Sequence, residues 1–337
     1  MLEIDGSAGE GGGQILRTSL ALSAITGTPF RMHDVRAKRS RPGLLRQHLT
    51  GVLAAAELCG ADVTGAHLGS AELRFVPGER RSGAFEFAVG TAGSANLVIQ
   101  AVLPILLHAP GPSTLVVRGG THNDKSPPWH FLAEAFLPLL RRMGADITTT
   151  LDRWGFYPAG GGAIAVEIRP GPLRPIEIGE RGEVELHAWA AVAGPVRVDV
   201  AKRELTVLGS RLAIPEERRR WVRAESPGPG NVAWVEAVSG GLTEVFTAFG
   251  ARGVSAEAVA GGLADEVGAW LASGAPVGEH LADQLLLPLA LAGGGGFLTV
   301  EPTLHTLTNI DVIRMFLPVT FDVARVGALT RIDVRPA

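Results

Sequence analysis

Three stretches of the chain place a polar glutamine at the start of a strongly apolar run. They begin at Gln14, Gln100 and Gln284, and in the last two a proline follows four residues later. A polar residue repeated at one end of a repeated apolar helix predicts duplicated units that share a central site. The first two copies lie 86 residues apart and the last two 184 apart, an excess of 98 residues. The excess predicts a domain inserted between the second and third units.

The first unit is predicted to occupy roughly the first 80 residues, from its hydrophobic periodicity. Apolar residues spaced three and four apart predict helices, and alternation of apolar and polar residues predicts strands. Gly60 follows the second helix, as glycine commonly does at helix C-termini. The predicted elements are a strand at 2–4, a glycine-rich segment at 9–13, a helix containing Gln14, a helix at 44–58, and strands at 62–64 and 72–76.

The second unit repeats this plan over roughly residues 84–150. It has a strand at 85–87, the helix with Gln100 and a second helix at 129–143. Its closing Gly144-Ala-Asp-Ile147 matches Gly60-Ala-Asp-Val63 at a displacement of 84 residues. Two independent marks with nearly the same period strengthen the prediction of duplication.

The third unit is predicted to start at the glycine-rich segment 155–162 and the strand 163–168, and to resume at Gly278 with the Gln284 helix. The intervening segment contains strands at 184–193 and 233–238 and helices at 200–213 and 257–272. Helices with one apolar stripe covering a sheet predict two-layer α/β units. The predicted organisation is a large domain at 1–180 and 278–337, with a small α/β insert at 181–277.

Composition limits the class of protein. The 337 residues are 46% hydrophobic and 19% charged, with a net charge of −3, which is typical of a globular protein and not of a disordered one. No apolar run reaches the roughly 18 residues of a membrane helix, and the N-terminus does not resemble a signal peptide. Cys59 is the only cysteine, so no internal disulfide forms. We therefore expect a cytoplasmic protein that does not associate with membranes.

Two neighbouring segments are candidate anion sites. Residues 35–56 include no acidic residue but five basic ones, and arginine donors match phosphate oxygens. Upstream, Glu10 precedes three glycines and the helix of Gln14, where a helix N-terminus favours anions and a carboxylate could hold a divalent cation. The alternatives are a solvated basic loop and a tight turn in which Glu10 caps the helix.

Two further motifs carry candidate chemistry. Polar residues His280, Asp283 and Gln284 lie at the start of a very apolar helix, although Asp283 could be an ordinary cap. Polar residues at the same end of all three repeated helices predict that the helix starts face one cleft. His305 follows a predicted strand and precedes a predicted helix at 308–316, a place where a nucleophile is often displayed; a lone histidine is more often structural.

Together and in this order, these motifs resemble the RNA 3′-terminal phosphate cyclase family. The resemblance implies an α/β protein in which three repeated βαβαββ units form the large domain, and a smaller thioredoxin-like α/β domain is inserted in the third. The matching segments span nearly the whole chain: 10–20, 36–48, 90–104, 119–121, 127–128, 155–162, 280–291 and 305–310.

The resemblance implies a ligase that uses ATP to convert the 3′-terminal phosphate of RNA into a 2′,3′-cyclic phosphate, releasing AMP and pyrophosphate. His305 would attack the α-phosphorus of ATP and form a covalent histidine–AMP, with Mg²⁺ or Mn²⁺ bound at Glu10. His280 stands where relatives often have Tyr. The implied ATP-binding residues are Gln100, Pro127, His280, Leu281, Ala282, Asp283 and Gln284, and the implied phosphate- or RNA-binding residues are Arg17, Arg36, Arg39, Gln47 and His48.

Two other functions compete with this one. A catalytically silent relative that binds RNA during ribosome assembly would lack the histidine, whereas His305, Glu10 and the arginines are all present here. An enolpyruvyl transferase is built from similar repeats but would need no covalent nucleotide. Labelled ATP that leaves AMP on the protein would separate the three.

Overall fold

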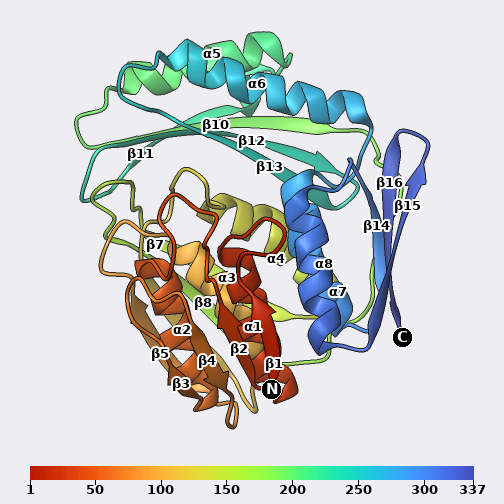
Figure 1. Cartoon of the computed structure of the whole chain (residues 1–337). Helices are drawn as coiled ribbons and strands as arrows, with labels where there is room; N and C mark the ends of the chain where they lie inside the picture. Colours follow the sequence, from red (N-terminus) through yellow and green to blue (C-terminus); the bar gives the residue numbers. More distant parts are fainter.

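The computed structural model describes all 337 residues, and it contains four sheets of four strands each. Figure 1 shows three of the sheets with their helices packed together and the fourth lying over them, covered on its outer side by two helices. The predicted α/β architecture is confirmed. No helix is long and apolar enough to cross a membrane.

The first unit follows the predicted βαβαββ order. Its first two strands are parallel and the last two are antiparallel to their neighbours, in the order β1-β2-β4-β3. The second helix ends at Gly60, which has the left-handed φ of 56° that glycine tolerates best. The elements are β1 (Leu2–Asp5), α1 (Gly13–Thr26), β2 (Phe30–His33), α2 (Arg46–Cys59), β3 (Asp62–Thr64) and β4 (Leu73–Val76).

The second unit has the same sheet order, β5-β6-β8-β7. The predicted helix at 129–143 begins as a π-helical turn, η1, and continues as α4. The elements are β5 (Gly83–Ala88), α3 (Ala95–Leu107), β6 (Ser113–Gly119), η1 (Phe131–Phe136), α4 (Leu137–Arg142), β7 (Asp146–Arg153) and β8 (Gly162–Arg169).

The start predicted for the third unit was wrong. The strand at 163–168 is β8, which pairs with β6 and β7 in the second sheet, and segment 155–162 joins β7 to β8. The third sheet begins instead at β9 (Glu177–Ile178), whose two residues are too few to produce an alternating pattern. The sheet has the repeated order, β9-β14-β16-β15. Its other elements are α7 (Glu279–Leu291), β14 (Gly295–Thr299), α8 (Leu304–Phe316), β15 (Val319–Val326) and β16 (Leu329–Pro336).

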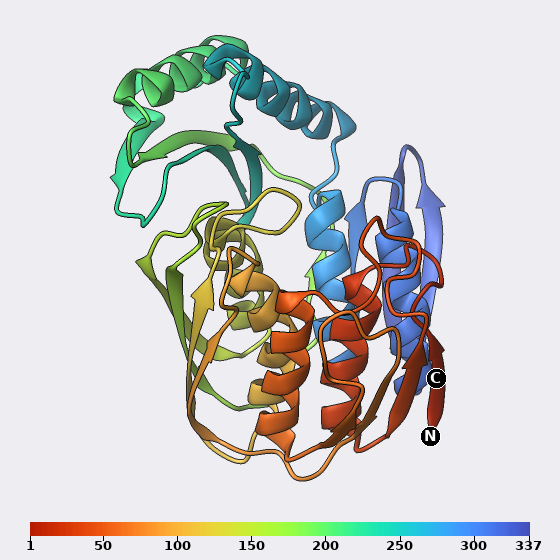
Figure 2. The same ribbon diagram turned by 60° about the vertical axis from the view of Figure 1, so that its left-hand side comes forward.

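The segment between β9 and α7 forms the fourth sheet, in the order β11-β10-β12-β13. One face packs under α5 and α6 around a core of 16 residues, while the other face joins the 69-residue core of the repeated units. Figure 2 shows this second face turned toward the repeated units. The elements are β10 (Glu185–Ala193), α5 (Val198–Arg211), η2 (Glu216–Arg218), β11 (Arg219–Ala224), β12 (Gly230–Ser239), β13 (Leu242–Phe249) and α6 (Ala256–Ser273).

Candidate active site

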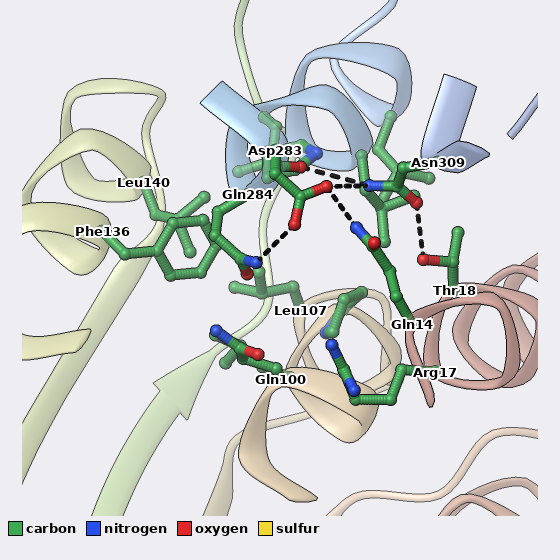
Figure 3. Close-up of a pocket in the computed structure, with 16 residues that line it drawn as sticks. Gln14, Arg17, Thr18, Gln100, Leu107, Phe136, Leu140, Asp283, Gln284 and Asn309 are labelled. Carbon is green, nitrogen blue, oxygen red and sulfur yellow. Dashed lines mark hydrogen bonds between the residues drawn. The ribbon is translucent and has the colours of Figure 1, made fainter. Parts of the chain in front are cut away.

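The three repeated glutamines line one small cavity. The prediction that each stands at a helix start holds only for Gln14, the second residue of α1, because Gln100 and Gln284 are each the sixth residue of their helix. Gln14 comes from α1, Gln100 from α3 and Gln284 from α7, and Figure 3 shows their side chains converging. Pro104 and Pro288, which lie inside α3 and α7, line the same cavity. Its volume of about 50 Å³ is far below the roughly 300 Å³ of a small-molecule pocket. The cavity is therefore too small to enclose a nucleotide, and it forms a floor lined by both polar and apolar side chains.

Asp283 is the centre of a buried hydrogen-bond network at this floor (Figure 3). Its carboxylate accepts hydrogen bonds from the amide groups of Gln14, Gln284 (3.1 Å) and Asn309 (3.3 Å). Asn309 in turn accepts a hydrogen bond of 2.7 Å from Thr18. Burial raises the pKa of Asp283, while the hydrogen bond from Gln14 and the charge of Arg17 act to lower it. Three donors around one carboxylate fix the direction of each amide.

The network determines which ring nitrogen of His305 is free. Because the Gln14 amide nitrogen donates to Asp283, its oxygen Oε1 faces His305 Nδ1 at 2.9 Å. An amide oxygen only accepts, so Nδ1 carries the ring proton and Nε2 keeps its lone pair. The His305 side chain is 53% exposed, and Nε2 lies 3.7 Å from Glu10 Oε2. Nε2 is therefore an accessible, unprotonated nitrogen in the neutral ring.

His305 lies within a helix and not in the loop that the sequence suggested. It is the second residue of α8, whose N-cap Thr303 accepts a hydrogen bond from the Thr306 backbone. The predicted start at 308 was four residues late. Free backbone N–H groups in the first helical turn favour anions, so the nitrogen of His305 is displayed where a phosphate would be attracted.

Glu10 has an arrangement that suits a divalent cation. Its side chain is only 4% exposed; Oε2 pairs with Arg39, whereas Oε1 is buried with no hydrogen-bond partner. A Cβ atom on Gly12 would collide with both this carboxylate and Arg39, so glycine is required for the pair to close over the loop. One carboxylate with an unused oxygen fits Mg²⁺, which commonly takes one or two carboxylates and completes its shell with phosphates and water.

The basic segment contributes unequal groups to the site. The Arg36 NH1 group donates to the backbone oxygens of Arg41 (2.7 Å) and Gly43 (2.8 Å), which fixes the loop. Gln47 Oε1 accepts a hydrogen bond of 2.9 Å from the Ser94 backbone at the start of α3. Arg39, by contrast, stays 42% exposed beside Glu10. The residues predicted to contact phosphate are therefore of two kinds. Arg36 and Gln47 bond to backbone groups and shape the loop, whereas Arg39 is exposed.

His48 is neutral and oriented. Burial, aided by the charges of Arg36 and Arg17, lowers its pKa to about 3. Its Nδ1 accepts a hydrogen bond of 3.2 Å from the Leu45 backbone, so Nε2 carries the proton. Nε2 lies where a Cβ atom of Gly13 would be, which brings a donor to the N-terminus of α1. Arg17, whose pKa burial lowers, lines the adjoining cavity.

In the segment at the start of α7 that is predicted to bind the nucleotide, only some of the side chains are exposed. His280 is 72% exposed, whereas Leu281 and Ala282 are 0% and 1% exposed and belong to the main core. The side chains of Leu281 and Ala282 pack inward, so they do not face a ligand. Their segment can offer backbone N–H groups at the helix start. Pro127 lies half-buried between β6 and η1, outside the cavity.

Sequence reasoning missed the roles of Asn309 and Thr308. Asn309 lies four residues after His305 on α8, a helical spacing that places both on one face. Thr308 accepts a hydrogen bond of 3.1 Å from the Glu10 backbone and so joins the first and third units. The i+4 spacing was available in the sequence, but it points to a site only once His305 is known to be helical.

The fold and site define an α/β protein of three like units that displays an exposed histidine, bonded to Gln14 and beside Glu10, at a unit junction. The chain belongs to the RNA 3′-terminal phosphate cyclase family, whose model matches residues 8–323.

Proteins of the same description match nearly the whole chain. The one from Koribacter versatilis (strain Ellin345) is 52% identical over 98% of this chain and 96% of its own. The one from Salmonella paratyphi C (strain RKS4594) is 49% identical over 99% of this chain and 97% of its own. Among solved structures, the enolpyruvyl transferase NikO from Streptomyces tendae aligns with a TM-score of 0.39 and 11% identity over 99% of this chain and 48% of its own. That likeness is too weak to carry an argument.

Proposed function

We propose that this protein uses ATP to convert the 3′-terminal phosphate of RNA into a 2′,3′-cyclic phosphate, with release of AMP and pyrophosphate. One observation supports it above the others: His305 Nε2 is accessible, and the Gln14 oxygen at 2.9 Å from Nδ1 fixes the reactive tautomer. Membership of the family agrees with this activity.

The reaction proceeds in three displacements at phosphorus. The lone pair of His305 Nε2 forms a bond to the α-phosphorus of ATP, and pyrophosphate leaves. A 3′-phosphate oxygen of the RNA then attacks the same phosphorus, which breaks the N–P bond and transfers AMP to the RNA end. Finally the 2′-hydroxyl attacks the 3′-phosphorus and expels AMP. Only the last step requires the hydroxyl that distinguishes RNA from DNA.

Residues around His305 serve binding and charge neutralisation. Arg17, Arg39 and His48 offer donors to phosphates, and Arg36 and Gln47 shape the loop that carries them. Gln100, Asp283, Gln284, His280 and the loop of Pro127 would surround ATP. Leu281 would contribute its backbone N–H, while Ala282, whose N–H bonds to the Gly278 oxygen, would support the turn from the core. Glu10 would hold Mg²⁺ or Mn²⁺, which supplies positive charge to the phosphates when bound.

The organisation into domains is part of the proposal. The large domain comprises 1–180 and 278–337, and the insert comprises 181–277, which begins before β10 and ends after α6. Its order of elements, β-α-β-β-β-α with the first two strands parallel, supports a thioredoxin-like assignment. The single cysteine, Cys59, is free and buried, which agrees with a cytoplasmic protein.

The test combines two substrates. With ATP and Mg²⁺, an oligoribonucleotide bearing a 3′-phosphate is expected to yield the cyclic phosphate, and the same oligonucleotide with a terminal 2′-deoxyribose is expected to stop as an adenylate. The protein alone is expected to acquire acid-labile AMP, and His305→Ala is expected to acquire none. A wild-type protein that binds the RNA yet takes no label with either metal would favour the silent ribosome-assembly protein.

A further inference from the structure

A buried glutamate of the inserted sheet lies against the start of α7. Glu244, in β13, is 3% exposed. Its Oε1 accepts a hydrogen bond of 2.6 Å from the backbone of Gly278, the N-cap residue of α7. Both carboxylate oxygens lie over Gly278, at 3.3 and 3.4 Å from where its Cβ atom would be. The carboxylate therefore covers the N-cap residue of the helix that carries His280, Asp283 and Gln284.

This contact replaces a cap that α7 lacks. α3, α6 and α8 each begin with a serine or threonine whose side chain accepts a backbone hydrogen bond. Gly278 has no side chain to do so. A glutamate bonded to the N-cap N–H makes the half of a capping box that normally comes from within the helix. Burial raises the pKa of Glu244 to about 8, so the contact acts through its hydrogen bond and not through a charge at the helix N-terminus. The insert thus supplies a capping hydrogen bond that usually comes from the helix itself.

The strand that carries Glu244 is held firmly on the repeated units. Leu242 and Val245, on either side of it, belong to the same main core as Leu281 and Ala282 of α7. On the other side, Val277 is held by β14 through a hydrogen bond of 2.9 Å from Thr299. The start of α7 is therefore fixed between its own sheet and the inserted one.

We propose that Glu244 is a positioning residue, through which the inserted sheet orients the first turn of α7 for the nucleotide. The inference rests on the proposed function, because it takes that turn as part of the ATP site. Under this proposal the insert contributes to ATP binding although Glu244 does not contact the ATP.

The test compares two buried glutamates of the insert. Glu204 is 0% exposed, lies in α5 and accepts a hydrogen bond of 2.9 Å from Asn231, and it makes no hydrogen bond to α7. Glu244→Ala is expected to raise the ATP concentration for half-maximal labelling of His305 about tenfold, because a backbone donor loses its partner. Its maximal extent of labelling should stay within about twofold, a split that general loss of folded protein would not produce.

Glu244→Gln keeps an acceptor and is expected to restore ATP dependence to within about twofold of the wild type. Glu204→Ala is expected to lower the melting temperature while leaving ATP dependence unchanged. If Glu244→Ala fails to fold, Gly278→Ala displaces the carboxylate from the helix side and should shift ATP dependence in the same direction.

An unchanged ATP dependence in Glu244→Ala, or an equal shift in Glu204→Ala, would overturn the proposal. Calorimetric binding of Mg²⁺–ATP provides the same comparison without the covalent step. If no variant and no wild type is labelled, the proposed function fails, whereas the calorimetric ranking still decides the role of Glu244.

Discussion

Two junctions of the molecule place histidines in opposite settings. Between the first and third units, His305 is half exposed and hydrogen-bonded to Gln14. Between the second unit and the insert, His122 and His130 bond each other at 3.0 Å within an aromatic ladder. His130 stacks on Trp234 with ring centroids 3.9 Å apart, and His122 on Trp154 at 4.2 Å.

Under the proposed function, the difference indicates what a nucleophilic histidine requires. Burial lowers the pKa of His130 to about 3 and that of His122 well below its usual value. Both rings are therefore neutral, as His305 must be to attack, yet stacking and burial shield them from any substrate. Neutrality alone is insufficient; the reactive ring needs solvent access and an acceptor that fixes the proton on the other nitrogen.

The largest effect is expected from removing that acceptor. Gln14→Ala leaves His305 Nδ1 without a partner and lets the ring rotate or change tautomer. We expect labelling by ATP to slow about 100-fold, or about 2.7 kcal/mol in the activation barrier, as for loss of an orienting group in related catalytic arrangements. Single-turnover labelling at saturating ATP measures this rate.

Gln100→Ala is the control, because it removes a glutamine that lines the same cavity but makes no hydrogen bond to His305. It is expected to affect the required ATP concentration more than the maximal rate. Equal losses of maximal rate in both variants would show that the floor of the site acts as one polar surface and not through the tautomer.

A smaller effect is expected at the other junction, on stability. The lowered pKa of His130 means that the folded protein binds fewer protons than the unfolded chain below about pH 6.5. Its contribution to the free energy of unfolding is complete above that pH and is lost as the pH falls toward 3, by about 1.4 kcal/mol per pH unit.

His130→Phe keeps a ring in the ladder and removes this titration, so the free energy of unfolding should fall less steeply between pH 6.5 and 4 than in the wild type. His48 and His122 contribute slopes of the same sign that remain in the variant. Urea unfolding at a series of pH values measures both slopes. Trp189 belongs to the same ladder, because its ring stacks on Trp234 with centroids 5.7 Å apart. Trp189→Phe removes no titrating group and should shift stability equally at every pH; an unaltered slope in His130→Phe would contradict the account.

The repeats could be predicted because each unit carries its own helix pattern and glycine stop. The Gln14 and Gln100 helices and the ending at Gly60 were visible as local patterns. The insert was predicted from the longer spacing between the second and third copies. The two-residue strand β9 was not, and neither were β11 and β13 of the insert, whose partners lie elsewhere in the chain. Pairing between distant strands leaves no mark in a local pattern.

The site was predictable in its residues but not in its connections. Glu10, Asp283 and His305 were identified by motif, yet the path from Asp283 through Gln14 to His305 joins α7, α1 and α8 and exists only in the folded chain. Helical periodicity is enough to predict that Leu281 packs inward. The motif alone, however, gave residues 280–284 the same ATP-binding role. Motifs therefore indicate which residues belong to a site, whereas the packing of the folded chain determines what each of them contacts.

The most direct test of the account is the position of AMP on the adenylylated protein. Peptide mapping followed by ¹⁵N and ³¹P NMR of the trapped intermediate identifies the bonded nitrogen. We predict AMP on Nε2 of His305, with the Nδ1 proton retained in a hydrogen bond to Gln14. AMP on Nδ1, or on any residue other than His305, would contradict the claim that the junction of the first and third units selects the nucleophile.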